Sequence, residues 1–349
     1  MKKITIYDIA KKLDVSPATV TRALNNQPKV GEEKRKLIIK TAEEMGYTPN
    51  RAATSLSRKQ ICIEVLIFGA IKEFYEDIID GINASYENLK DFNLRVNMHI
   101  LDKSTSDENK VCSVLDSFDG NKIDGVLIYS VSDTKKIANS LDRLISEEVS
   151  VMVINSDIST RHSHYVVRPD GEMAGSMAAI ILEWATTRKN ICFFMGDKDT
   201  GILRHNNHGF LKEAKEQSLN IVEQFYDEGD AEKALQYFEE FIAKECCHID
   251  GIYINSAVSN AICRGLHERG LLDKYHIVAS DLGEDIIQYI SSEQINATIF
   301  QNPFKQGFDS LDRLYAVISG HKDVEETKFI NPVIICKSNV AFYAQFARK

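Results

Sequence analysis

The chain has 349 residues, 44% of them hydrophobic, and a formal net charge of −9, so it is long enough for two or three domains around a sizeable core. Its composition is that of an ordinary globular protein, and no stretch approaches the ~18 consecutive apolar residues of a membrane span. Because the seven cysteines form no CxxC pair and no signal-peptide apolar run follows the N-terminus, we expect reduced thiols and a cytoplasmic protein.

Residues 5–25, TIYDIAKKLDVSPATVTRALN, predict two short amphipathic helices joined by a tight turn. Thr5 and Asp8 have the spacing of a capping box at the start of the first helix. Ser16 is a good N-cap for the second helix, and Pro17 suits its first position. This pattern is typical of a helix-turn-helix, whose second helix enters the DNA major groove. An ordinary helical hairpin is the alternative.

The second helix of this pair has a small, polar outer face. Arg22 can make a bidentate contact to a guanine edge, and the short neighbours let the backbone approach the groove. A third helix is expected over about 32–45, closed by Gly46, which completes a headpiece over residues 1–49. The outward-facing positions of the second helix are Pro17, Ala18, Thr21 and Arg22.

Charge is distributed unevenly along the chain. Residues 1–60 contain 13 Lys+Arg against 6 Asp+Glu, whereas the remainder contains 29 against 45. A basic headpiece attracts phosphate, and the acidic body disfavours wrapping of DNA around it. Residues 50–60, NRAATSLSRKQ, have no apolar stripe and are predicted to form a hinge, in which Leu56 is the only large aliphatic residue.

From Ile61 onward, short apolar strands alternate with amphipathic helices. Segments such as IEVLIFGA, IDGVLIYS and IDGIYINS are examples of the strands. This alternation predicts parallel α/β sheets with right-handed crossovers, and nearly 290 residues of it suggest two similar lobes. Ligands of such sheets bind beyond the carboxyl ends of the strands, so we expect a cleft between the lobes.

Polar and aromatic side chains stand at several predicted strand ends. Asp281 ends IVASD, where a carboxylate can accept two sugar hydroxyls. Asn255 and Gln301 end IYIN and ATIFQ, and their amides both donate and accept hydrogen bonds. Phe74 and Tyr75 follow the first strand and can stack on a pyranose face. The alternative for each polar residue is a structural role as a strand-end or helix cap.

The N-terminal motif, the segment MGYTPNRAATSL and the body motifs ATIFQNPFKQG and YVVRPDGEMAG resemble the LacI/GalR family of bacterial transcription regulators. The resemblance implies a homodimer on a pseudo-palindromic operator, with a body built like type I periplasmic sugar-binding proteins and a carbohydrate as effector. Leu56 matches the family's hinge leucine, which wedges into the minor groove. The expected DNA contacts are Thr5, Tyr7, Ser16, Pro17, Ala18, Thr19, Thr21, Arg22, Asn25, Asn50, Ala53 and Leu56.

The resemblance also implies three crossovers between the lobes, which we place near residues 160, 283 and 323. Lobe one then comprises 61–160 with 284–322, and lobe two comprises 161–283 with 323–349. Asn206 stands where the family commonly has an arginine, for which Arg204 is the nearest substitute. The expected ligand contacts are Phe74, Tyr75, Asn155, Ser156, Arg204, Asn206, Asn255, Asp281 and Gln301.

The chain is thus predicted to be a sequence-specific DNA-binding regulator, by default a repressor, that a small polar ligand switches. One alternative is a solute-binding receptor without a DNA role, and another is an α/β enzyme fused to a DNA-binding domain. The chain has no GxGxxG, GxxxxGK[ST], HExxH or GxSxG motif, so we expect no catalytic residues and no cofactor. His205 and His208 have no third ligand at a matching spacing, so no metal centre is expected.

Overall fold

A computed structural model describes most of the chain, and the chain divides into two compact units, Met1–Lys59 and Gln60–Lys349. The predicted DNA contacts Asn25, Asn50, Ala53 and Leu56 lie outside the described residues, as does all of the predicted hinge except Gln60. The described residues are 4–24, 29–45, 47, 60–156, 158–196, 201–227, 229–244, 248–256, 258–321 and 323–344.

The first unit contains the three predicted helices, α1 (Ile6–Leu13), α2 (Pro17–Leu24) and α3 (Glu32–Glu44). Each helix contributes two apolar side chains to a common core between the three helices, as the amphipathic pattern of the sequence predicts. The buried residues of this small core are Ile9, Ala10, Val20, Ala23, Ile38 and Ala42.

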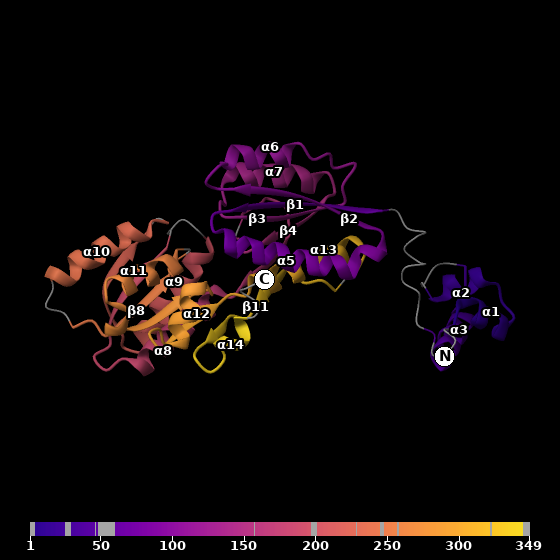
Figure 1. Ribbon diagram of the computed structural model, residues 1–349. Coiled ribbons are helices and arrows are strands. Elements are labelled where there is room, and N and C mark those ends of the chain that lie inside the picture. The colour runs from indigo at the N-terminus through magenta and orange to yellow at the C-terminus, as the bar shows by residue number, and fades with distance from the viewer. Residues whose placement is uncertain are drawn as a thin grey trace. The chain divides into compact units, whose positions relative to one another are not determined.

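The second unit has two lobes, each built on one six-stranded sheet. The first sheet is entirely parallel, in the order β11-β5-β4-β3-β1-β2. Helices α6 and α7 cover one of its faces and α5 and α13 the other (Figure 1). The bounds are β1 (Ile61–Gly69), α5 (Lys72–Leu89), η1 (Lys90–Phe92), β2 (Leu94–Asp102), α6 (Glu108–Asp116), β3 (Gly125–Ser130), α7 (Lys135–Ser146), β4 (Ser150–Ile154), β5 (Tyr165–Pro169), α13 (Pro303–Ile318) and β11 (Thr327–Ile330).

The second sheet repeats this strand order as β12-β10-β9-β8-β6-β7, with only β12 antiparallel to its neighbour. Helices α8 and α9 cover one face, and α10, α11, α12 and α14 cover the other. The bounds are α8 (Gly171–Ala185), β6 (Asn190–Met195), α9 (Gly201–Glu216), β7 (Asn220–Tyr226), α10 (Ala231–Lys244), β8 (Gly251–Asn255), α11 (Ser259–Glu268), η2 (Leu272–Lys274), β9 (His276–Ser280), α12 (Glu284–Ser291), β10 (Ala297–Phe300), β12 (Val333–Ile335) and α14 (Val340–Tyr343).

The central strands are buried on both faces because helices cover both sides of each sheet. Every residue of β3 and of β8 is buried, which explains why these strands are apolar runs rather than alternating ones. The same dipeptide, Asp-Gly, stands at the start of both strands, with the glycine as the first strand residue. Asp124, just before β3, accepts a hydrogen bond from the N–H of Cys62, and Asp250, just before β8, accepts one from the N–H of Arg188. The two lobes are therefore similar in detail as well as in strand order.

The crossovers between the lobes come later in the chain than the predicted positions 160, 283 and 323. Strand β5 belongs to the first sheet, β10 to the second, and β11 returns to the first. The chain therefore changes lobes after Pro169, Phe300 and Ile330. The predicted boundaries are wrong because each change of lobe comes after a strand, at the end of β5, β10 and β11, whereas the predicted positions lie before these strands.

Glycines allow one pair of helices in each lobe to pack with their backbones in close approach. A Cβ atom at Gly81 of α5 would lie 1.9 Å from a backbone oxygen of α13, and one at Gly307 of α13 would lie 2.0 Å from a backbone oxygen of α5. The same arrangement joins α8 and α9 through Gly175 and Gly209, at 2.1 and 2.2 Å. Any larger residue at these positions must push the helices apart.

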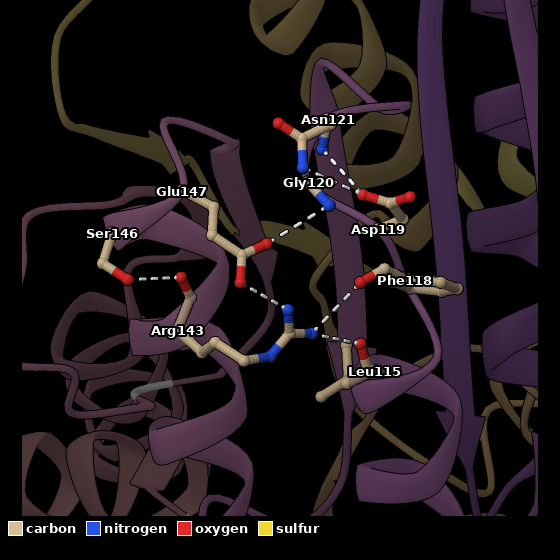
Figure 2. Close-up of polar contacts among 8 residues, drawn as sticks. All are labelled: Leu115, Phe118, Asp119, Gly120, Asn121, Arg143, Ser146 and Glu147. Atoms are coloured by element: carbon tan, nitrogen blue, oxygen red, sulfur yellow. Dashed lines mark hydrogen bonds and ion pairs between the residues drawn. The ribbon is translucent and has the colours of Figure 1, made fainter.

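Arg143 ties the C-terminal end of α6 to α7 in the first lobe. Its guanidinium donates to the carbonyl oxygens of Leu115 at 2.9 Å and Phe118 at 3.3 Å, at and just beyond the end of α6, where the Leu115 carbonyl also accepts the N–H of Phe118 at 3.2 Å (Figure 2). It also pairs with Glu147 at 2.9 Å, and Glu147 accepts the N–H of Gly120 at 3.2 Å. One side chain thus satisfies several backbone groups at this corner.

We expect Arg143→Met to lower the free energy of unfolding by about 1–3 kcal/mol, because it leaves the two carbonyl groups without a charged donor. Urea denaturation measures this loss. Ser146→Ala is the matched control, because the one bond of the Ser146 hydroxyl among the described residues goes to the carbonyl of Arg143 in its own helix. Equal stability of the Arg143→Met variant and the wild type would contradict a capping role.

Candidate DNA-binding and ligand-binding sites

Side-chain caps fix the start of both helices in the helix-turn-helix. The N–H and hydroxyl of Thr5 donate to the Asp8 carboxylate at 2.8 and 2.6 Å. Asp14 adopts a left-handed conformation with φ 50° and turns the chain between the helices. The Ser16 hydroxyl then accepts the N–H of Thr19 at 3.1 Å, which caps α2. Helix α2 therefore begins at a defined residue and presents a fixed set of side chains.

The outer face of α2 is accessible, as the spacing predicts. Ala18 and Arg22 are exposed, whereas Val20 and Ala23 face the core. Arg22 forms no hydrogen bond or ion pair with the residues that the structure describes, so its guanidinium can reach a base edge. Tyr7 on α1 is 68% exposed. The remaining predicted contacts on α2 are partly exposed: Pro17, Thr19 and Thr21.

A group of polar and aromatic side chains gathers where the strands of the second unit end. Electrostatic interactions link Asp281, after β9, to Tyr129 of β3 and to Asp77 of α5, so both lobes contribute. The rings of Phe74 and Tyr129 lie 6.1 Å apart between centroids. Asn155 is grouped with them because it follows Ile154, the register partner of Tyr129 in the neighbouring strand β4. We call this group the strand-end site, and its members are Phe74, Asp77, Tyr129, Asn155, Asp281 and Gln301.

Asp281 and Gln301 hold one another at the ends of neighbouring strands. The Gln301 side-chain amide donates to one Asp281 carboxylate oxygen at 2.9 Å, and its backbone N–H donates to the other at 3.4 Å. Asp281 adopts a left-handed conformation with φ 60°. Burial raises the pKa of Asp281 to about 7; the hydrogen bonds from Gln301 oppose this rise, and the charge of Asp77 adds to it.

Asn155 occupies in the first sheet the position that Asp281 occupies in the second. Each follows the fourth strand of its sheet counted from the β2 or β7 edge, and Asn155 too is left-handed, with φ 50°. Its backbone N–H donates to the carbonyl of Val167 at 2.9 Å. The side chain is nine-tenths buried, and its Oδ1 has no hydrogen-bond partner among the described residues. Ser156 beside it is also buried.

Tyr129 and Asp77 were not predicted from the sequence. Burial and the nearby Asp281 charge raise the pKa of Tyr129. Burial, followed by the charges of Asp80 and Glu76, raises the pKa of Asp77 to about 7. The available signals were weak, since Tyr129 lies one residue before the end of its strand and Asp77 lies inside a helix that reads as an ordinary amphipathic one.

Tyr75 does not suit the predicted stacking role. Its side chain is 5% exposed and belongs to the core of the first lobe, where its hydroxyl donates to Asp102 at 3.2 Å. The absence of a side chain at Gly69 makes room for the ring, because a Cβ there would lie 2.1 Å from it. Consecutive helical residues point about 100° apart, so Phe74 and Tyr75 cannot both face one ligand.

Asn206 and Asn255 are buried in an amide network of the second lobe. The Asn206 carbonyl oxygen accepts the Tyr253 hydroxyl at 2.6 Å, and the Asn255 amide donates to Asn207 at 2.6 Å. All of these side chains are at most 5% exposed. Asn206 therefore bonds a side chain of β8 in the interior of the lobe. This role differs from the ligand contact that the resemblance implies for the arginine at this position.

Arg204 forms an ion pair between the lobes. It lies on α9 of the second lobe, and its guanidinium is 4.0 Å from the carboxylate of Asp133, which follows β3 in the first lobe. The guanidinium is 59% exposed, so the pair is a weak one. Arg204 thus does not replace the missing arginine within the strand-end site.

Other features of the described residues lie away from this site. Two surface pockets, of about 510 and 340 Å³, are lined by residues 103–110 and by residues around the start of α8, and neither contains a predicted ligand contact. No three His, Cys, Asp or Glu side chains of the described residues are grouped to hold a metal ion. None of the described helices combines the length and apolar character needed to cross a bilayer.

Together, a helix-turn-helix unit and a two-lobed body with polar strand ends define a DNA-binding protein that responds to a ligand. Residues 5–50 match the family "Bacterial regulatory proteins, lacI family", and residues 65–322 match "Periplasmic binding protein domain". The chain belongs to the lacI family of bacterial regulatory proteins. It is a ligand-regulated, DNA-binding transcriptional repressor.

Curated relatives include "Probable HTH-type transcriptional repressor ExuR" of Bacillus subtilis, 30% identical over 248 residues that cover 69% of each chain. "HTH-type transcriptional regulator DegA" of the same species is 26% identical and covers 76% of this chain and 78% of its own. These relatives are regulators of transcription.

Solved structures show the same fold. The lac repressor dimer bound to operator and the anti-inducer ONPF has a TM-score of 0.62 at 18% identity, over 96% of this chain and 98% of that one. A solute-binding protein of an ABC transporter from Burkholderia graminis, in complex with D-arabinose, has a TM-score of 0.71 at 17% identity, over 82% and 98% of the two chains.

Proposed function

We propose that the protein acts as a homodimer on a pseudo-palindromic operator and that a small carbohydrate bound at the strand-end site changes its operator affinity. The observation that carries the proposal is that the two lobes meet beside their strand ends, because Asp133, which follows β3 in the first lobe, lies 4.0 Å from Arg204 of α9 in the second. The D-arabinose complex of the relative from Burkholderia graminis supports a carbohydrate, because its fold resembles the body of this chain.

The strand-end site has the chemistry that a carbohydrate requires. The Asp281 carboxylate accepts hydrogen bonds from hydroxyl groups, and the Asn155 oxygen is a further acceptor. The ring of Phe74 offers an apolar face beside Tyr129. We propose that the other predicted contacts, Ser156, Asn206, Asn255 and Gln301, line or support the same site.

The switch follows from the position of the site between two lobes. A ligand that contacts both lobes favours the arrangement in which both can reach it, and this shifts the population of lobe arrangements. If one arrangement spaces the two headpieces for the operator, effector and operator affinities are linked reciprocally. The Arg204–Asp133 pair joins the same two lobes, so its strength also depends on their arrangement.

The test is a gel-shift series on operator DNA selected from random sequence, repeated across salt concentrations with and without candidate sugars. We expect one sequence class to bind more tightly than random duplex, with an affinity that falls as salt rises. A binding sugar should alter that affinity. Equal binding to all DNA would instead favour the alternative of a solute-binding receptor, and a sequence preference that no small molecule changes would remove the effector role.

Arg22→Ala should reduce operator discrimination by about 1–3 kcal/mol at one base pair, because the exposed guanidinium is the group on α2 that can bind a guanine bidentately. Competition binding with operators mutated one base pair at a time measures this loss. The control is Lys40→Ala on α3, whose ammonium is 75% exposed and lies 4.0 Å from Glu44. An equal loss on every sequence would show that Arg22 contacts phosphate.

A further inference from the structure

We infer that the outer face of α8 is a contact between two copies of this chain, in which their α8 helices pair side by side in opposite directions about a two-fold axis. The inference goes beyond the proposed function, which requires two headpieces on one operator but assigns nothing to α8. Three observations support it: an apolar stripe that the described elements leave exposed, a spacing that matches itself when it is reversed, and opposite charges at the two ends of the stripe.

The outer face of α8 carries large apolar side chains that the described elements leave wholly or partly exposed. Met173 and Trp184 are 41% and 76% exposed. Met177 and Ile180, between them, are partly exposed. Steps of three and four residues place all four within about 60° around the helix, because consecutive residues are about 100° apart. The other side of α8 packs against α9 and strands β8, β9 and β10, so the helix is apolar on both sides, as is typical of a buried helix.

The four exposed side chains, which we call the α8 stripe, have a spacing that is unchanged when the helix is reversed. A two-fold axis brings the same surface of both copies together. If the axis passes between residues 178 and 179, Met173 of one copy faces Trp184 of the other, and Met177 faces Ile180. No other antiparallel register pairs all four residues. The paired stripes extend over roughly 16 Å of helix, at 1.5 Å per residue.

A surface pocket at the start of α8 can receive the partner's indole ring. The pocket, of about 340 Å³, is lined by Met173 of α8 and by Phe329 of β11, which is 47% exposed. The Arg168 guanidinium lies over the Phe329 ring, 5.2 Å from its centroid. Pockets for small molecules begin at about 300 Å³, so one indole fits. In the antiparallel register, Trp184 of the second copy lies opposite Met173, at the rim of this pocket.

Opposite charges stand at the two ends of the α8 stripe. Glu172, 54% exposed and 3.3 Å from His208, precedes the stripe, and Asp170 lines the pocket beside it. Arg188 follows the stripe, is exposed, and has no hydrogen bond or ion pair from its guanidinium to a described residue. Antiparallel pairing brings Arg188 of each copy toward the Glu172 end of the other, whereas parallel pairing would bring like charges together. The charges therefore favour a second copy in the antiparallel direction.

The size of the contact predicts a weak association. A stable interface buries about 800 Å² on each partner, and a single pair of helices offers less. Most of the buried area would come from the two tryptophans, because a tryptophan side chain buries about 150–250 Å² and is enriched among the residues that dominate interfaces. We therefore expect a dissociation constant in the micromolar range.

Trp184 is the only tryptophan of the chain, so its fluorescence reports directly on the contact. The pure full-length protein, without DNA or sugar, is measured at about 50 μM, well above a dissociation constant of about 1 μM. We expect the emission of a buried indole, which iodide quenches poorly. Emission of an exposed indole at this concentration would overturn the inference and leave the α8 stripe to a partner of another kind.

Ile180→Lys tests whether a second copy covers the indole, because it places charges beside the two-fold axis and leaves Trp184 in place. At the same concentration, the mass from light scattering should fall to half that of the wild type, and the emission should become that of an exposed indole. Phe342→Lys is the control, since Phe342 is 58% exposed on α14, on the other face of the same sheet, and it should change neither. Thermal melting confirms that both variants are folded. An unchanged mass for Ile180→Lys would overturn the inference, whatever the emission.

A charge reversal tests the direction of the pairing. Arg188→Glu and Glu172→Arg should each raise the dissociation constant about fivefold, the upper range for an exposed ion pair. The double variant carries both changes in each copy, so the pairs form again with their charges exchanged and most of the association should return. No recovery in the double variant would overturn the antiparallel pairing. Operator and sugar are absent from all these measurements, so failure here leaves the operator and effector roles of the proposed function in place.

Discussion

Replacing Asp281 with alanine is expected to abolish the change in operator affinity that the effector causes. The substitution removes the carboxylate that faces both lobes and leaves the backbone N–H and side-chain amide of Gln301 without their acceptor. Loss of hydrogen bonds to a charged group weakens binding by about 1.5–3 kcal/mol, which is tenfold to more than a hundredfold. The measurement is the ratio of operator affinities with and without a bound sugar.

The control for this experiment is Glu284→Gln, an exposed carboxylate three residues further along the chain. It should leave the ratio of operator affinities as in the wild type, since it removes a charge near the site without removing a ligand contact. A full effector response from the Asp281→Ala variant, with the protein folded by circular dichroism, would exclude Asp281 from the site.

The second large effect concerns the packing of α5 against α13. Gly307→Ala should destabilise the body by about 3 kcal/mol, because the new Cβ would lie 2.0 Å from a backbone oxygen and the helices must separate. Thermal and urea unfolding measure the loss. Gly31→Ala is the control, because a Cβ there would meet no atom within 4 Å.

A double-mutant cycle sharpens this test. Gly81 and Gly307 contact each other's helices reciprocally, so once one substitution has separated the helices the second should meet less resistance. The combined loss for Gly81→Ala with Gly307→Ala should therefore be smaller than the sum of the single losses. Strict additivity would mean that the two close approaches are independent, and unchanged stability would show that the helices adjust freely.

Local patterns predicted the parts of the fold in which neighbouring residues decide the structure. The caps at Thr5 and Ser16 depend on side chains three residues apart, and the apolar face of α2 depends on helical spacing. Asp281 and Gln301 were predicted as strand ends because an apolar run stops at a polar residue, and the structure brings them within hydrogen-bond distance.

What the sequence did not predict depends on contacts between distant segments. The crossovers follow Pro169, Phe300 and Ile330 because sheet pairing, not the strand pattern, decides to which lobe a strand belongs. Tyr75 turns into the core because a glycine on another element leaves space for its ring. Asp77 joins the strand-end site only through the approach of the two lobes, which no local pattern records.

Asn155 and Asp281 share a backbone conformation and equivalent places in two similar sheets, but one is an amide and the other an acid. Two identical residues would hold a small molecule equally well in either of two orientations related by the repeat. The difference in charge removes that ambiguity, since the end of the molecule that carries donors or positive charge is favoured on the acidic side. In the proposed site, the two similar sheets thus supply equivalent backbone positions, and the difference between Asn155 and Asp281 favours one orientation of the bound molecule.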